Sequence, residues 1–211
     1  MKRRYRDETF FKNFVIFKKL FTQQECEYLI SVFKNKSYSQ ATVMDHSKSK
    51  GNDIQGKLDD YSRKGHLVFI DKTEKGCALY FGKVYQAALT ANFGWSTFPP
   101  QFIQLTEYDS STDGGFYKRH RDIILDQNPQ RIISCVTQLS PMGSYTGCEL
   151  VFDKGDGKPE LHTYTDQGDT IFFLADEPHE VTPISSGVRY SMVTWLLGPP
   201  YWTKDNLPER F

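Results

Sequence analysis

The chain has 211 residues, enough for one compact domain whose core needs no disulfide staple. Lysine plus arginine equal aspartate plus glutamate at 26 each, so the formal net charge is zero and a general nucleic-acid binder is not expected. The basic N-terminus has only a short apolar run broken by lysines, unlike a signal peptide, and no later run is long enough to span a membrane. We therefore predict a cytoplasmic protein with no membrane partner.

The first part of the chain predicts two helices. Residues 5–21 alternate aromatic and charged side chains, which is typical of one or two short strands. Thr22 and Glu25 then have the spacing of a capping box, followed by apolar residues at helical spacing. A strand is predicted over residues 66–70 and a second amphipathic helix over residues 73–93.

Residues 36–64, between the first helix and that strand, are polar and almost without apolar periodicity. Such a stretch is long for a loop inside a compact domain, so it indicates a flexible, lid-like segment. Closure of a lid beside a reactive site would exclude water.

From residue 102 the pattern changes to short β-rich runs separated by Gly, Pro, Asp and Ser. This spacing is typical of a sandwich, a barrel or a jelly roll. The runs are FIQLTEY, RIISCVTQL, CELVF, ELHTY, DTIFFL, HEVTPI and RYSMVTWLL. We predict a single compact unit: N-terminal strands and helices over 1–100, a β core over 101–198, and a tail over 199–211.

Three residues of the β half could hold a metal. On a strand, His120 and Asp122 would point to one face, and His179 follows a strongly apolar run that could present it at a sheet edge. Two imidazoles and one carboxylate suit the facial triad of Fe(II) oxygenases. Alone, each is as well explained as a surface residue.

Arg189 is the fourth candidate. Strand alternation places it on one face with Val193 and Trp195, a face expected to point into the core. A buried arginine needs an anion, either a bound carboxylate or an acid of the chain such as Asp169.

In this order the residues resemble the Fe(II)- and 2-oxoglutarate-dependent dioxygenases of the prolyl 4-hydroxylase type, and within them the PKHD-type hydroxylases. The resemblance is carried by Tyr117-x-x-His120-x-Asp122, Arg131, Gly147-Cys148-Glu149-Leu150-Val151-Phe152, Gly168-Asp169, His179-Glu180-Val181-Thr182-Pro183, Gly187-x-Arg189 and Trp195. It covers residues 102–197 well and residues 18–34 weakly.

The resemblance implies a mainly β, α+β fold: a double-stranded β-helix, jelly-roll or cupin-like, with N-terminal helices packed against it. It also implies that His120, Asp122 and His179 ligate Fe(2+) and that Arg189 binds the distal carboxylate of 2-oxoglutarate. Tyr108 is the expected tyrosine on the same carboxylate, while Tyr117 and Trp195 are further cofactor-binding candidates.

The implied reaction hydroxylates a C–H bond with O2 and 2-oxoglutarate, releases succinate and CO2, and uses ascorbate as reductant. A prolyl residue of a peptide or protein is the expected substrate, with small molecules as the alternative. His46, His66 and His162 are assigned no role.

Two positions depart from the family pattern. Cys148 stands where a second glycine is usual before Glu149, and Gln138 occupies a strand position that is often aromatic or aliphatic. Cys148 is one of four widely spaced cysteines, with no CxxC pair, which we expect to be reduced and buried: Cys26, Cys77, Cys135 and Cys148.

Two other functions share part of this pattern. A nucleic-acid demethylase of the AlkB type also has HxD and a distal histidine, but it would need arginine at the position of Trp195. A non-catalytic cupin-like metal-binding module would keep the β core without needing Arg189.

Overall fold

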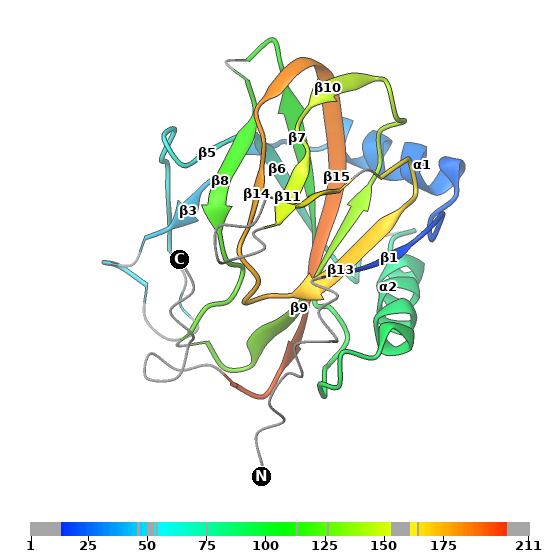
Figure 1. Cartoon of the computed structure of the whole chain (residues 1–211), viewed down its shortest axis with the longest axis vertical. Coiled ribbons are helices and arrows are strands. Elements are labelled where there is room, and N and C mark those ends of the chain that lie inside the picture. The colour runs from blue at the N-terminus through cyan, green and yellow to red at the C-terminus, as the bar shows by residue number, and fades with distance from the viewer. Residues whose placement is uncertain are drawn as a thin grey trace.

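The computed structural model describes residues 14–45, 47–49, 53, 55–74, 76–112, 114–125, 127–152, 161–163 and 165–201. Two antiparallel sheets face each other, as in a jelly roll, and two helices lie against the outer side of the larger sheet (Figure 1). The predicted mainly β fold with supporting N-terminal helices is therefore confirmed. Neither helix is long and apolar enough to cross a membrane.

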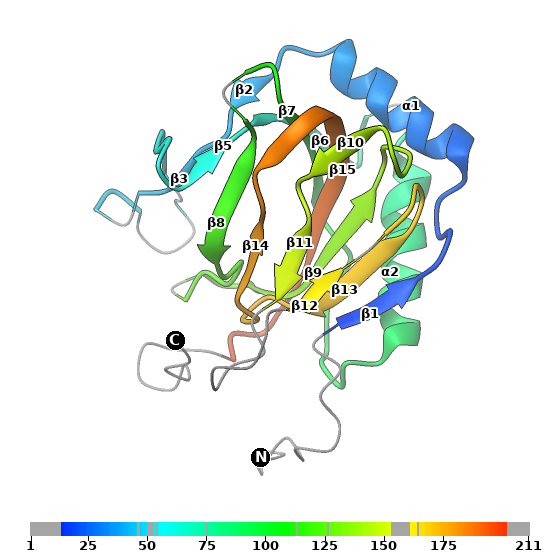
Figure 2. The same ribbon diagram turned by 45° about the horizontal axis from the view of Figure 1, so that its top comes forward.

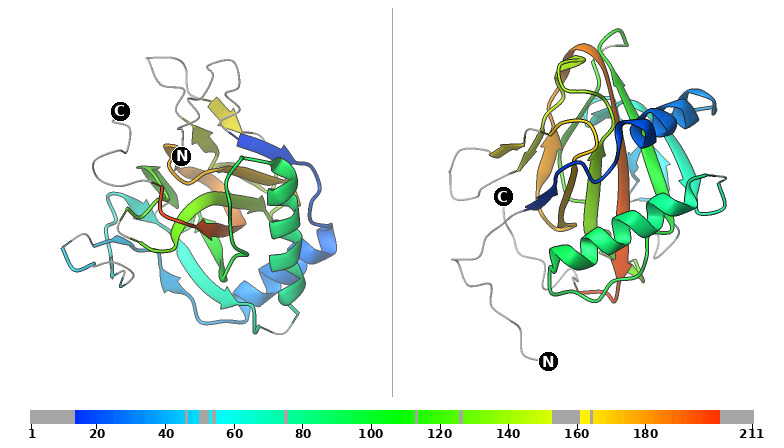
Figure 3. Two further views of the ribbon diagram at one scale, coloured as in Figure 1. Left: turned by 90° about the horizontal axis from the view of Figure 1, so that it is seen from below. Right: turned by 90° about the vertical axis from the view of Figure 1, so that its right-hand side faces the viewer.

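The larger sheet carries the helices on one face. Across it, the strands are β1 (Phe14–Phe17), β13 (Thr170–Leu174), β9 (Gln130–Gln138), β15 (Ile184–Gly198), β7 (Phe102–Asp109), β6 (His66–Asp71) and β2 (Ser39–Gln40), with β10 (Tyr145–Gly147) also paired to β15. The helices are α1 (Gln23–Lys34) and α2 (Ala78–Ala91). Figure 3 shows both helices on the same side of this sheet.

The smaller sheet lies over the other face of the larger one (Figure 2). Its strands, in order, are β12 (Leu161–Thr163), β11 (Leu150–Phe152), β14 (His179–Val181), β8 (Phe116–His120) and β5 (Arg63–Lys64). A separate two-stranded ribbon pairs β3 (Val43–Met44) with β4 (Gly56–Lys57).

Two apolar clusters account for this layering. The larger joins α1 and α2 to the outer face of the larger sheet through residues such as Ile133 and Cys135 of β9. A smaller cluster lies between the sheets, where Phe152 and Phe173 pack together and Val136 of β9 contacts them. Neighbouring residues in the second half of β9 thus face opposite sides, so Ser134, Val136 and Gln138 point between the sheets.

The helix starts differ in how well the sequence predicts them. The Thr22–Glu25 capping box is present: the Glu25 amide donates to Thr22 Oγ1 at 3.2 Å, and the Thr22 amide donates to Glu25 Oε2 at 2.7 Å. By contrast, α2 begins at Ala78 rather than at residue 73. Turns and a bend occupy residues 72–74 and 76–77 before it, and the Asp71 carboxylate accepts a hydrogen bond from the Thr73 amide.

The segment 36–64 is not a featureless loop where it is described. It contains the four two-residue strands β2, β3, β4 and β5, and β5 joins the smaller sheet by pairing with β8. Polar residues suffice for these short edge strands because backbone hydrogen bonds form them, without an apolar face. Whether this segment acts as a lid stays a prediction.

Gly168 lies just before β13 and approaches Phe21, which lies just before α1, and its replacement tests this contact. Its φ is +87°, and a Cβ there would lie 2.0 Å from the Phe21 carbonyl oxygen. We expect Gly168→Ala to lower the free energy of unfolding by about 2–4 kcal/mol, through left-handed strain plus overpacking. Denaturant unfolding measures this.

Gly82 provides the matched control for that substitution. It lies within α2, and a Cβ there meets no described atom within 4 Å. Gly82→Ala should therefore raise stability by about 0.5–1 kcal/mol, because alanine is the better helix former. Equal effects at both glycines would contradict the close approach at Gly168.

Candidate metal centre and neighbouring cation

Two strands of the smaller sheet bring the candidate metal ligands together. His120 ends β8, His179 begins β14, and the two residues are register partners. Asp122 lies beyond the end of β8, where its amide donates to the Ala175 carbonyl at 2.9 Å. The prediction that Asp122 shares a strand with His120 is wrong, although the turn still directs the carboxylate to the same point.

The three side chains converge closely enough to share one ion. His120 Nε2 lies 3.5 Å from Asp122 Oδ1, and His179 Nε2 lies 3.8 Å from Asp122 Oδ2. One ligand atom from each residue falls within 4.8 Å of the others, and in the described part of the chain no other group of three such residues does so. His179 and Asp122 are buried.

Backbone carbonyls orient both imidazoles. His120 Nδ1 lies 2.8 Å from the Lys118 oxygen, and His179 Nδ1 lies 2.9 Å from the Glu177 oxygen. A carbonyl only accepts, so each Nδ1 donates a proton to it, and Nε2 is the ring nitrogen that faces Asp122 and is available to a metal. This is the arrangement that metal-ligating histidines usually have.

The charges of the cluster also suit a cation. Burial lowers the pKa of His179 and the adjacent His120 lowers it further, to about 4, so the ring is neutral at pH 7. Burial favours the neutral form of Asp122, but attraction to His179 and His120 outweighs it and holds the pKa of this carboxyl well below its usual range. A neutral His179 imidazole beside an ionised Asp122 carboxylate suits metal binding, which requires these protonation states of its ligands.

This donor set fits the metal that the sequence suggests. Two histidine nitrogens and one carboxylate on adjoining segments form the 2-His-1-carboxylate arrangement typical of non-haem Fe(II) oxygenases. Ser134 of β9 donates from Oγ to Asp122 Oδ2 at 2.6 Å, which fixes the carboxylate. The residues therefore fit Fe(II).

Arg189 is a buried cation on the face of the larger sheet that also faces the metal ligands. It is 4 % exposed, its Nε donates to Gln138 Oε1 at 2.9 Å, and its Nη1 lies 4.0 Å from Cys148 Sγ. Asp169 instead pairs with Lys18 at 2.8 Å. Among the described residues, no carboxylate lies within ion-pair distance of Arg189, so its charge is left for a ligand.

The three aromatic candidates occupy different places. Tyr108 of β7 is the register partner of Arg189, with its ring 5.9 Å from the guanidinium carbon. Tyr117 instead stacks on the His120 ring at 3.5 Å. Trp195 lies six residues from Arg189 along β15, against the guanidinium of Arg131 at 3.8 Å, so it belongs to the metal end. Its assignment to cofactor binding stays a prediction.

Two residues that hold this site were not among the sequence candidates. Ser134 fixes Asp122 and Gln138 fixes Arg189, and both lie on the inner face of β9. Their signal in the sequence is a pair of polar residues four apart, which strand alternation places on one face with Val136 between them. That spacing corresponds to roughly 13 Å along the strand. One face of β9 therefore contacts the metal ligands through Ser134 and Arg189 through Gln138.

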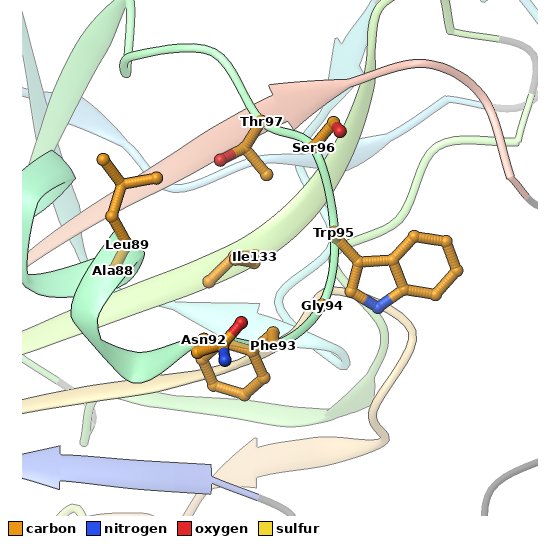
Figure 4. A pocket seen from close by; sticks show the side chains of 9 residues that line it. All are labelled: Ala88, Leu89, Asn92, Phe93, Gly94, Trp95, Ser96, Thr97 and Ile133. Carbon is orange, nitrogen blue, oxygen red and sulfur yellow. The ribbon is translucent and has the colours of Figure 1, made fainter. Parts of the chain in front are cut away.

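The other histidines and a cavity of the described part of the chain lie elsewhere. His66 pairs with Glu107 and His162 with Glu149, while His46 lies outside the described residues. A cavity of about 240 Å³ lies between the end of α2, the following loop and Ile133 of β9 (Figure 4). Because Ile133 faces the helices, this cavity is on the opposite side of the larger sheet from the triad.

Comparison with known proteins agrees with this geometry. Residues 103–197, which span the triad and Arg189, match the family model described as the 2OG-Fe(II) oxygenase superfamily. This stretch of the chain is therefore similar to that superfamily. The resemblance predicted from the sequence motifs is thus confirmed, and neither the AlkB-type nor the cupin-module alternative is favoured.

Relatives and solved structures extend this likeness. A PKHD-type hydroxylase of Idiomarina loihiensis is 26 % identical over 59 % of this chain and 55 % of its own length, so the chain spans about half of that relative. A Pseudomonas putida prolyl-4-hydroxylase has a TM-score of 0.65 at 20 % identity, covering 88 % and 92 % of the two chains. A Trichoplax adhaerens prolyl hydroxylase in complex with a hypoxia inducible factor peptide fragment has a TM-score of 0.68 at 16 % identity, covering 88 % and 83 %.

Proposed function

We propose that this protein is an Fe(II)- and 2-oxoglutarate-dependent dioxygenase that hydroxylates a C–H bond of a prolyl residue in a peptide or protein. The observation that carries the proposal is the pairing of a 2-His-1-carboxylate cluster with a buried arginine that has no described carboxylate partner. One feature suits the metal and the other suits the far end of a dicarboxylate.

The three ligands would each have a distinct environment. His120 and His179 would bind iron through Nε2, since their Nδ1 atoms are committed to backbone carbonyls. Asp122 would bind through its carboxylate, held by Ser134. When bound, Fe(II) with 2-oxoglutarate and O2 supplies the oxidising power, so that one oxygen atom enters the substrate C–H bond and the other enters succinate as CO2 leaves.

Arg189 would bind the distal carboxylate of 2-oxoglutarate. Gln138 accepts from its Nε, and the acceptor for Nη1 is the weakly accepting Cys148 sulfur, so the Nη groups can still bind the ligand. A guanidinium can bind a carboxylate with two parallel hydrogen bonds. Tyr108 is the tyrosine beside this end, and its hydroxyl would add a further donor. Burial raises the pKa of Tyr108 to about 12, which keeps that donor protonated at pH 7.

A peptide or protein substrate is supported by the fold that this chain shares with the two prolyl hydroxylases. Trp195 argues against the AlkB-type demethylase, and the buried Arg189 argues against a metal-binding module without a cosubstrate. The cytoplasmic location and the use of ascorbate as reductant stay predictions.

The proposed class can be tested with the purified full chain. We expect Fe(II), 2-oxoglutarate, ascorbate and O2 to give 2-oxoglutarate-dependent succinate, and a panel of proline-containing peptides to include one that gains 16 Da. The control omits Fe(II). Absence of succinate, with and without peptides, from protein shown to bind Fe(II) would contradict the proposal.

A further inference from the structure

Cys148 places a thiol against the guanidinium of Arg189. It is 1 % exposed, its Sγ lies 4.0 Å from Arg189 Nη1, and it packs in one buried cluster with Tyr108 and Ile184. Arg189 is itself a buried cation without a carboxylate partner among the described residues, so an anionic ligand is expected there. The thiol therefore borders the space that an anion on Arg189 would occupy.

The backbone holds Cys148 in a conformation that favours glycine. Its φ is +56°, in the left-handed region, where any side chain costs free energy. Hydrogen bonds on both sides fix the conformation: the Cys148 amide donates to the Pro183 carbonyl at 3.2 Å, and the Glu149 amide donates to Thr182 Oγ1 at 2.8 Å. A strained residue that its surroundings hold in place beside a binding site suggests a use for its side chain.

The thiol does not compete with a carboxylate for the arginine. Burial raises the pKa of Cys148, although the Arg189 charge and hydrogen bond oppose the shift. At pH 7 Cys148 is therefore a small neutral group, which limits space beside Arg189 without neutralising it.

We propose that Cys148 is a specificity-determining residue that limits the length of the 2-oxo diacid bound between the metal end and Arg189. This inference rests on the proposed function. Because Sγ lies 4.0 Å from Nη1, the thiol takes up space beside the guanidinium, and an acid with one more methylene than 2-oxoglutarate would have to displace it. One methylene in a closed pocket changes binding by about 10–200-fold.

Binding of two acids to the full chain tests this role without depending on turnover. The protein is loaded with Zn(II), which has no redox chemistry, and titrated with 2-oxoglutarate and 2-oxoadipate in a calorimeter. For the wild type we expect 2-oxoglutarate to bind at least about tenfold more tightly. Cys148→Gly and Cys148→Ala should each reduce this ratio about tenfold or more.

Cys148→Gly is expected to fold, because glycine adopts the positive φ without strain. Cys148→Ala keeps the Cβ and removes only the sulfur, which separates the effect of space from that of backbone freedom. The matched control is Cys77→Ala, which removes a buried thiol from the helix-covered cluster and should leave the ratio unchanged.

The outcomes separate this inference from the proposed function. An unchanged ratio in both Cys148 variants, with 2-oxoglutarate still binding, overturns the role of Cys148 and leaves the dioxygenase proposal standing. Failure of the Zn(II)-loaded wild type to bind either acid overturns the proposed function, and the role of Cys148 with it.

Discussion

His179→Ala is expected to abolish stable Fe(II) binding and with it 2-oxoglutarate turnover. The substitution leaves His120 and Asp122 as a two-ligand site, and loss of one donor should weaken Fe(II) binding by at least about 100-fold, more than loss of a residue that only orients a ligand. Anaerobic titration with Fe(II), read by a colorimetric chelator after desalting, measures the affinity and stoichiometry.

The fold should survive this substitution. The strand pairing of β14 with β8 and β11 uses backbone groups, and the lost ring packs against His120 at 4.3 Å and Phe173 at 4.7 Å. The far-ultraviolet circular dichroism spectrum should therefore be unchanged. The matched control is His162→Ala, which removes a half-exposed imidazole paired with Glu149 in the same sheet and should bind Fe(II) like the wild type. Wild-type affinity in His179→Ala would refute the triad.

Sequence patterns predicted the helix that begins with a capping box and the strands that consist of apolar runs. The Thr22–Glu25 capping box marks the start of α1, and the apolar runs mark β7, β9, β13 and β15. Strand β8 was not among the predicted β-rich runs, because FYKRH has no apolar face. In the smaller sheet it is paired on both sides, with β14 and with β5. Backbone pairing from β14 and β5 makes it a strand.

The site was predictable as a set of residues but not as an arrangement. His120, Asp122 and His179 could be named from their order, yet their convergence depends on the register of β8 with β14, which no local pattern carries. Likewise, Gln138 meets Arg189 only because β9 and β15 are adjacent across a long crossover. Pairings between distant segments had to come from the fold.

The layering of the fold also explains why the site has two separate ends. The triad stands on the smaller sheet, whereas Arg189 stands on the larger one, and the inner face of β9 contacts both through Ser134 and Gln138. A ligand that spans from metal to arginine therefore bridges the two sheets. The metal ligands and Arg189 should contribute to ligand affinity separately. Loss of the arginine should therefore lower the affinity for the ligand without lowering the affinity for the metal.

Arg189→Ala is expected to raise the concentration of 2-oxoglutarate needed for half-maximal succinate formation by about 100-fold, with Fe(II) affinity retained. Removing one partner of a buried charge pair costs about 2–5 kcal/mol, and 2.7 kcal/mol corresponds to about 100-fold. Arg189→Lys should need a 2-oxoglutarate concentration between those of the wild type and Arg189→Ala. An ammonium group supplies the charge but lacks the planar guanidinium geometry, and it cannot reproduce the Nε contact with Gln138.

Two comparisons make this result specific to the arginine at this position. Arg119→Ala removes a part-exposed arginine of β8 near Glu180 and should leave the 2-oxoglutarate requirement unchanged. Fe(II) titration of Arg189→Ala should match the wild type, because Arg189 stands on the larger sheet while the ligands come from the smaller one. If Arg189→Ala needed no more 2-oxoglutarate than the wild type, another cation would have to bind the distal carboxylate. Loss of the guanidinium that binds a carboxylate always weakens the binding of that carboxylate.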